Sequence, residues 1–99
     1  MSYNLIIAPE AQKDVDDAYW WYEDRRTGLG EEFLGCVDVC VQTICRIPDL
    51  YPVVHEHYRR ALVRRFPYSV FYEFTPESVT IYSIFHSSRD PKKWHTLLK

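Results

Sequence analysis

The sequence predicts an α+β fold with the element order β-α-α-β-β-β, in which a helical hairpin packs on one face of a small, mainly antiparallel four-stranded sheet. Three observations lead to this prediction. Apolar residues recur at helical spacing through the first half of the chain, a glycine-containing break divides that half, and the period changes to two near residue 58. With 99 residues, of which 46% are hydrophobic, the chain can fill one core. We therefore expect a single domain over residues 1–99.

The first half should contain a short strand and two helices. The apolar run Tyr3–Ala8 is typical of a strand, and Pro9 then stands where a proline can start a helix. The apolar stripe of this helix comprises Ala11, Val15, Ala18, Tyr19 and Tyr22. The stretch "TGLG" at 27–30 breaks the pattern, and a second helix is expected from Glu31 to about Ile47. Its apolar face comprises Phe33, Val37, Cys40, Val41 and Ile44. A short connection between the helices predicts an antiparallel hairpin.

The second half should form three strands, because β-rich segments at 58–65, 68–74 and 79–86 are separated by "FP" and "TPES". Side chains on a strand alternate between its two faces, and the hairpin can cover only one face of the sheet. The expected core side comprises Ala61, Val63, Val70, Tyr72, Phe74, Val79, Ile81 and Phe85. The expected open face comprises Arg60, Leu62, Arg64, Ser69, Phe71, Glu73, Thr80, Tyr82, Ile84 and His86.

The expected open face mixes guanidinium groups with apolar and aromatic side chains, which is typical of a surface that binds a partner. A C-terminal segment that folds back over this face is the alternative. The run "RRALVRR" at 59–65 fits a phosphate-binding strand or a charged edge that resists aggregation. Trp20 points away from the helical stripe, as an exposed residue or as a partner contact.

Charge and cysteine content narrow the classes of function. Residues 1–56 hold 4 Lys or Arg against 11 Asp or Glu, whereas residues 57–99 hold 8 against 3, so the C-terminal half is basic. The overall net charge of −2 does not favour nucleic-acid binding. The three cysteines indicate core packing and not a disulfide framework or a zinc site. We expect no metal, no cofactor and no membrane segment, and a cytoplasmic location.

Three stretches in one order suggest a known family: "WWYEDRRTGLGEEFL" at 20–34, "RRALVRRFPYSVFYEF" at 59–74 and "FHSSRDPKKW" at 85–94. Together they resemble the RelE/ParE superfamily of type II toxin–antitoxin toxins, in its ParE-like or plasmid-stabilisation branch. The resemblance implies a RelE/ParE-like fold and a cognate antitoxin that neutralises the toxin. It implies one of two actions: ParE-like inhibition of DNA gyrase, or RelE-like cleavage of messenger RNA on the ribosome.

The residues favour binding over catalysis. By the resemblance, Arg60 matches the first basic site of the ribonuclease branch, but Leu62 and Ser69 stand where basic residues are expected. Trp94 replaces a tyrosine, and an indole N–H has no acid/base chemistry. The remaining catalytic candidates are Arg60, His86 and Arg89. We expect a gyrase-binding toxin that is not an enzyme; a ribosome-dependent endoribonuclease and a non-toxic binding domain remain the alternatives. The candidate residues for contact with target or antitoxin are Trp20, Arg60, Leu62, Arg64, Phe71, Tyr82, Ile84, His86, Arg89 and Trp94.

Overall fold

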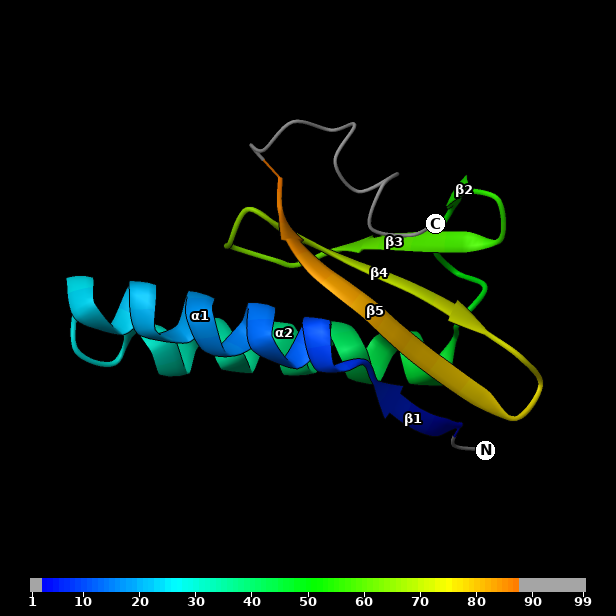
Figure 1. Ribbon diagram of the computed structural model, residues 1–99, viewed down its shortest axis with the longest axis horizontal. Coiled ribbons are helices and arrows are strands. Elements are labelled where there is room, and N and C mark those ends of the chain that lie inside the picture. The colour runs from blue at the N-terminus through cyan, green and yellow to red at the C-terminus, as the bar shows by residue number, and fades with distance from the viewer. Residues whose placement is uncertain (1–2, 88–99) are drawn as a thin grey trace.

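Two helices lie side by side on one face of a five-stranded sheet (Figure 1). A computed structural model describes residues 3–87. The elements are β1 (Asn4–Ile7), α1 (Pro9–Arg25), α2 (Leu29–Arg46), β2 (Val53–His55), β3 (Tyr58–Leu62), β4 (Tyr68–Phe74) and β5 (Ser78–His86). The predicted α+β hairpin-on-sheet architecture is confirmed. The sheet has one strand more than expected, because the short segment after Pro52 pairs with β3 as β2.

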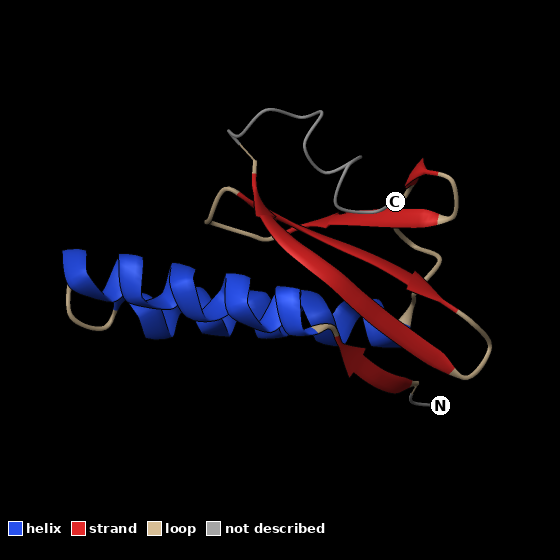
Figure 2. Cartoon of the chain, viewed as in Figure 1, coloured by secondary structure: helices blue, strands red, loops and turns tan. Residues whose placement is uncertain are grey.

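The strand order is β1-β5-β4-β3-β2, so the first strand pairs with the last (Figure 2). β1 runs parallel to β5, with Asn4 opposite Ser78 and Ile7 opposite Ile81, and the other neighbours are antiparallel. The backbone N–H of Ala8 then donates to the carbonyl of Ile81 at 2.9 Å, immediately before α1 begins at Pro9. This hydrogen bond holds the connection between β1 and α1 against β5.

The hairpin turn depends on Glu23 and on two glycines. The Glu23 carboxylate accepts hydrogen bonds from the backbone N–H groups of Gly28 and Gly30, both at 3.0 Å. Gly28 has φ 92°, a left-handed conformation that glycine adopts without steric cost. At Gly30 a Cβ would lie 2.8 Å from the Tyr19 ring, so the helices approach too closely for a side chain. Because Glu23 caps these N–H groups, α2 begins at Leu29, two residues earlier than predicted.

The main core lies between the hairpin and the sheet. Phe33 is fully buried, with its ring centroid 5.3 Å from that of Tyr22 and 5.4 Å from that of Phe66. The Tyr72 hydroxyl donates to the Pro48 carbonyl at 2.6 Å, which satisfies this polar group inside the core. The predicted burial of one side of the hairpin against one side of the sheet is confirmed for Phe33, Val37, Ile44, Val70, Tyr72 and Ile81.

A β-bulge in β5 changes which side chains face the helices. Phe71 and Tyr72 are consecutive on β4, yet they pair with Ser83 and Ile81, so Tyr82 is the extra residue on β5. Beyond the bulge the alternation is reversed. The prediction for Ile84 and Phe85 was therefore wrong: Ile84 is buried in the main core, and Phe85 belongs to a second cluster with Phe71.

Candidate functional site

A groove runs between α2 and the end of β3. Its volume is about 400 Å³, in the range of ligand pockets. Val39 and Leu62, which are 57% and 61% exposed, line it together with Gly35, where an added Cβ would meet no atom within 4 Å. We call this surface the arginine-rimmed groove, and it is lined by Glu32, Gly35, Cys36, Val39, Cys40, Thr43, Tyr51, Leu62, Arg64 and Arg65. Its floor is apolar and open.

The rim of the groove carries a positive excess. Glu32 receives hydrogen bonds from Arg65 at 2.8 Å and from Arg26 at 3.1 Å. The hydrogen bond from Arg65 lowers the pKa of the Glu32 carboxyl, which therefore stays ionised between two cations. On the floor, burial raises the pKa of the Cys40 thiol to about 11, so this cysteine stays protonated at neutral pH. The groove thus combines apolar surface with guanidinium groups and has no reactive thiolate at Cys40.

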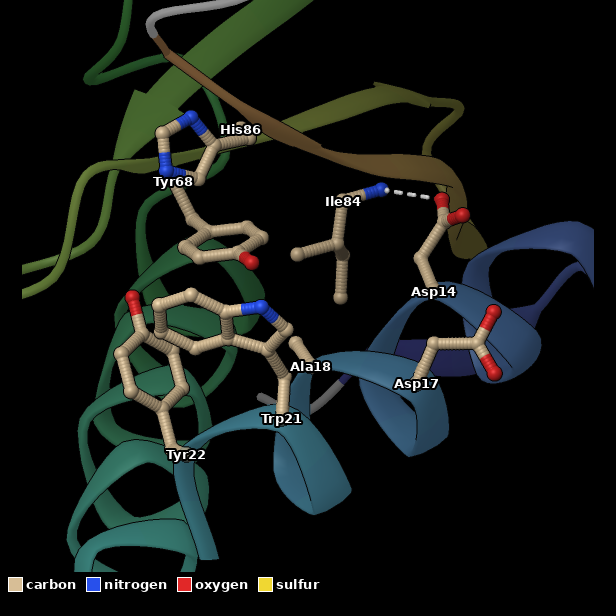
Figure 3. Close-up of a pocket in the computed structure, with 8 residues that line it drawn as sticks. All are labelled: Asp14, Asp17, Ala18, Trp21, Tyr22, Tyr68, Ile84 and His86. Atoms are coloured by element: carbon tan, nitrogen blue, oxygen red, sulfur yellow. Dashed lines mark hydrogen bonds between the residues drawn. The ribbon is translucent and has the colours of Figure 1, made fainter. Parts of the chain in front are cut away.

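A second hollow lies between α1 and the ends of β4 and β5 (Figure 3). Its volume is about 410 Å³. We call it the acidic aromatic pocket, and it is lined by Asp14, Asp17, Ala18, Trp21, Tyr22, Tyr68, Ile84 and His86. In Figure 3 the rings of Trp21, Tyr22 and Tyr68 stand on one side of Ile84, and the carboxylates of Asp14 and Asp17 stand on the other. Aromatic rings and two acidic residues therefore border one cavity, and the Asp17 carboxylate is directed away from Ile84.

Asp14 joins α1 to β5 at the β-bulge. Its Oδ2 atom accepts a hydrogen bond from the backbone N–H of Ile84 at 3.1 Å and another from the Ser83 hydroxyl at 3.2 Å. A bulge disturbs the ladder hydrogen bonds of a sheet, and here a helix side chain provides an acceptor for a strand N–H. Asp14 therefore has a structural role in addition to its charge.

The face of the sheet away from the helices is partly closed by its own side chains. We call it the distal face. Phe71 is only 1% exposed, and Val54, Tyr58 and Tyr82 pack on its cluster with Phe85. The prediction that this face is an open apolar surface was therefore wrong at Phe71. A polar network crosses the same face.

In that network the Glu73 carboxylate accepts a hydrogen bond from the Tyr82 hydroxyl and lies 2.5 Å from His57 Nε2. Burial and the hydrogen bond to Glu73 raise the pKa of Tyr82 to about 12, so its phenol is protonated at neutral pH.

The predicted contact residues do not form one surface. Leu62 and Arg64 line the groove, whereas Ile84 and His86 line the pocket on the other flank of the hairpin. Arg60 pairs with Phe71 and lies on the distal face with Tyr82. Trp20 is exposed on α1, as expected, and lines neither hollow. Arg89 and Trp94 lie outside the described residues.

His86 corrects a further prediction. It was expected on the open face, but it pairs with Tyr68, and its ring centroid lies 5.0 Å from that of Tyr68 inside the pocket. The reversed alternation beyond Tyr82 is the physical reason. Two catalytic candidates, Arg60 and His86, consequently lie on opposite faces of the sheet.

Sequence reasoning missed Asp14, Asp17 and Trp21 as one set. Their spacing of three and four residues places them on one side of α1, beside the apolar stripe. The helical period of the sequence could therefore have predicted that they lie together. It also missed Val39 and Tyr51 in the groove, because these residues become neighbours only through the fold.

Among residues 3–87, no three His, Cys, Asp or Glu side chains are grouped to hold a metal ion. Within this range, neither helix has the length and apolarity that crossing a membrane requires.

Comparison with known proteins gives one consistent result. The sequence model of the family described as "ParE toxin of type II toxin-antitoxin system, parDE" matches residues 5–91. Toxin ParE2 of Mycobacterium tuberculosis, from the strains CDC 1551 and H37Rv, is 25% identical over 92 residues, which cover 92% of this chain and 88% of the relative. A solved structure, "Chromosomal ParDE TA system from P. aeruginosa", superposes with a TM-score of 0.76 at 16% identity, covering 86% of this chain and 96% of that chain.

Proposed function

The chain belongs to the ParE toxin family of type II toxin–antitoxin systems, and we propose that it arrests growth by binding DNA gyrase in the cytoplasm until a cognate antitoxin neutralises it. The role as a toxin follows from membership of this family. The choice of gyrase over messenger RNA rests on one observation, which is that the positions expected to perform RNA cleavage carry groups unsuited to it.

RNA cleavage through a 2′-hydroxyl needs a base, an acid and a cation placed around one phosphate. Leu62 offers no titratable group, and Ser69, which pairs with it across the strands, is 4% exposed and lies 3.4 Å from the Ser87 hydroxyl. Arg60 and His86 lie on opposite faces of the sheet. Their side chains therefore point in opposite directions and do not converge on one phosphate. These placements support inhibition by binding.

We assign antitoxin binding to the arginine-rimmed groove. The exposed side chains of Val39 and Leu62 would be covered by an apolar segment, and Arg64 at the rim favours acidic residues beside that segment. Complementary apolar and charged surface is what a toxin needs to hold a neutralising chain tightly.

Expression in bacteria tests the proposal. Induction of the chain alone should stop growth, and co-expression with the small neighbouring gene product should restore it. The two proteins should then co-purify as a stable complex. Unimpaired growth, together with no small partner gene, would favour a non-toxic binding domain.

A further inference from the structure

We propose that the acidic aromatic pocket binds the guanidinium group of an arginine side chain presented by a protein partner. The pocket lies on the α1 side of the hairpin, whereas the proposed antitoxin groove lies on the α2 side. The inference goes beyond the proposed function, because it depends neither on gyrase nor on occupancy of the groove.

The walls of the pocket match the parts of an arginine side chain. Ala18 and Ile84 form an apolar floor on which the methylene stem can lie. The carboxylates of Asp14 and Asp17 stand on one side of Ile84, and the rings of Trp21 and Tyr68 stand on the other (Figure 3). A planar cation between these walls gains charge-assisted hydrogen bonds and contact with aromatic rings.

Trp21 already binds a guanidinium group within this chain. The Cζ atom of Arg25 lies 3.2 Å from the centroid of the Trp21 ring, and Arg25 Nη1 donates to the Trp21 carbonyl at 3.1 Å. Trp21 is nevertheless 50% exposed and lines the pocket. Arg25 therefore covers one part of the indole, and the exposed remainder of the ring is available at the pocket.

The charges around the pocket favour a cation over a phosphate. α1 carries more acidic than basic residues: Glu10, Asp14, Asp16, Asp17, Glu23 and Asp24 against Lys13 and Arg25. Lys13 pairs with Asp17 at 2.8 Å, but both side chains are largely exposed, and exposed ion pairs contribute little and exchange readily. An incoming arginine can therefore share the Asp17 carboxylate.

Arginine fits better than lysine for a geometric reason. Asp14 Oδ2 already accepts hydrogen bonds from Ser83 and Ile84, and Asp17 lies one helical turn further along α1, so a planar fork with several N–H donors can reach the remaining acceptor positions of both carboxylates. An ammonium group is a point charge that is more strongly hydrated and does not stack on a ring. The pocket should therefore discriminate between the two cations.

Nuclear magnetic resonance of the full chain can test this assignment with three peptides: acetyl-Gly-Arg-Gly-amide, its lysine counterpart and its uncharged citrulline counterpart. The arginine peptide should shift the indole N–H signal of Trp21 and the backbone signals of Asp17 and Ile84. Asp17→Asn should weaken its binding about tenfold or more, which is the scale of a charge-assisted hydrogen bond. The lysine peptide should bind less tightly, and the citrulline peptide should cause no shift.

Two matched controls separate the pocket from general attraction to an acidic helix. Asp16→Asn removes the same charge next to Asp17 but outside the pocket, and Trp20→Leu is the control for Trp21→Leu, which should weaken binding of the arginine peptide. Both controls should leave the affinity unchanged. Equal weakening by Asp16→Asn, or equal binding of citrulline, would overturn the proposal. It would also be overturned if neutralising Arg89, Lys92 and Lys93 tightened peptide binding tenfold, because the pocket would then serve the chain's own basic residues.

Discussion

Two hollows of nearly equal volume flank the same helical hairpin, and their walls carry opposite chemistry. The arginine-rimmed groove on the α2 side exposes aliphatic side chains beneath guanidinium groups, whereas the acidic aromatic pocket on the α1 side places carboxylates opposite aromatic rings. The net charge of −2 conceals this division. Under the two proposals, the toxin would contact two partners, or two segments of one partner, through different flanks of the hairpin.

The largest expected effect comes from breaking the core that supports both hollows. Phe33 is fully buried between the hairpin and the sheet, so Phe33→Ala should lower the free energy of unfolding by about 3–5 kcal/mol. Urea unfolding followed by circular dichroism measures this loss. The exposed Val39→Ala serves as control and should change stability by less than about 0.5 kcal/mol. Equal effects of the two changes would contradict the description of the core.

A charge placed in the groove should weaken binding at this flank of the hairpin and leave binding at the other flank unchanged. Leu62→Asp puts an anion on the floor of the proposed antitoxin site, and because Leu62 is 61% exposed, stability should hardly change. Antitoxin binding should weaken by about 2 kcal/mol or more, as at an interface hot spot. Calorimetric titration measures the affinity.

The matched control for this change is Leu50→Asp, since Leu50 is similarly exposed but does not line the groove. Binding of the arginine peptide to the pocket should be equal in both variants. If Leu50→Asp weakened antitoxin binding as much as Leu62→Asp, the groove would not be the antitoxin site.

On the other flank, Asp14→Asn should reduce stability by about 1–3 kcal/mol, the range for hydrogen bonds that lose their charged partner. The amide keeps the shape of the side chain but removes the charge that faces the N–H of Ile84 and the hydroxyl of Ser83. Thermal unfolding measures the effect, with the exposed Asp16→Asn as control. Affinity for the antitoxin should stay constant, and a parallel loss would mean that the two flanks are coupled.

The fold could be predicted from the sequence because its signals are local. Helical spacing identified Phe33, Val37 and Ile44, and strand alternation identified Ala61, Val70 and Ile81, since one buried face imposes one period on each element. The first residue of α2 was harder to predict from the sequence, because the N–H groups at its start are capped by Glu23 from the preceding helix.

The site could be predicted only in part. The bulge at Tyr82 reversed the alternation of β5, and no local pattern in "VTIYSIFH" indicates an extra residue. His86 and Ile84 were therefore placed on the wrong face. The arginine rim of the groove was visible in "RRALVRR", but its apolar floor needs Val39 of α2, which is distant in sequence.

The proposed action is tested most directly by giving the purified protein to two enzyme systems in parallel. One assay measures supercoiling of relaxed plasmid by DNA gyrase, and the other measures cleavage of messenger RNA on programmed ribosomes. We predict inhibited supercoiling, relieved by the antitoxin, and intact messenger RNA. Codon-specific cleavage that Arg60→Ala abolishes, with supercoiling unaffected, would contradict the account and identify the protein as a ribonuclease.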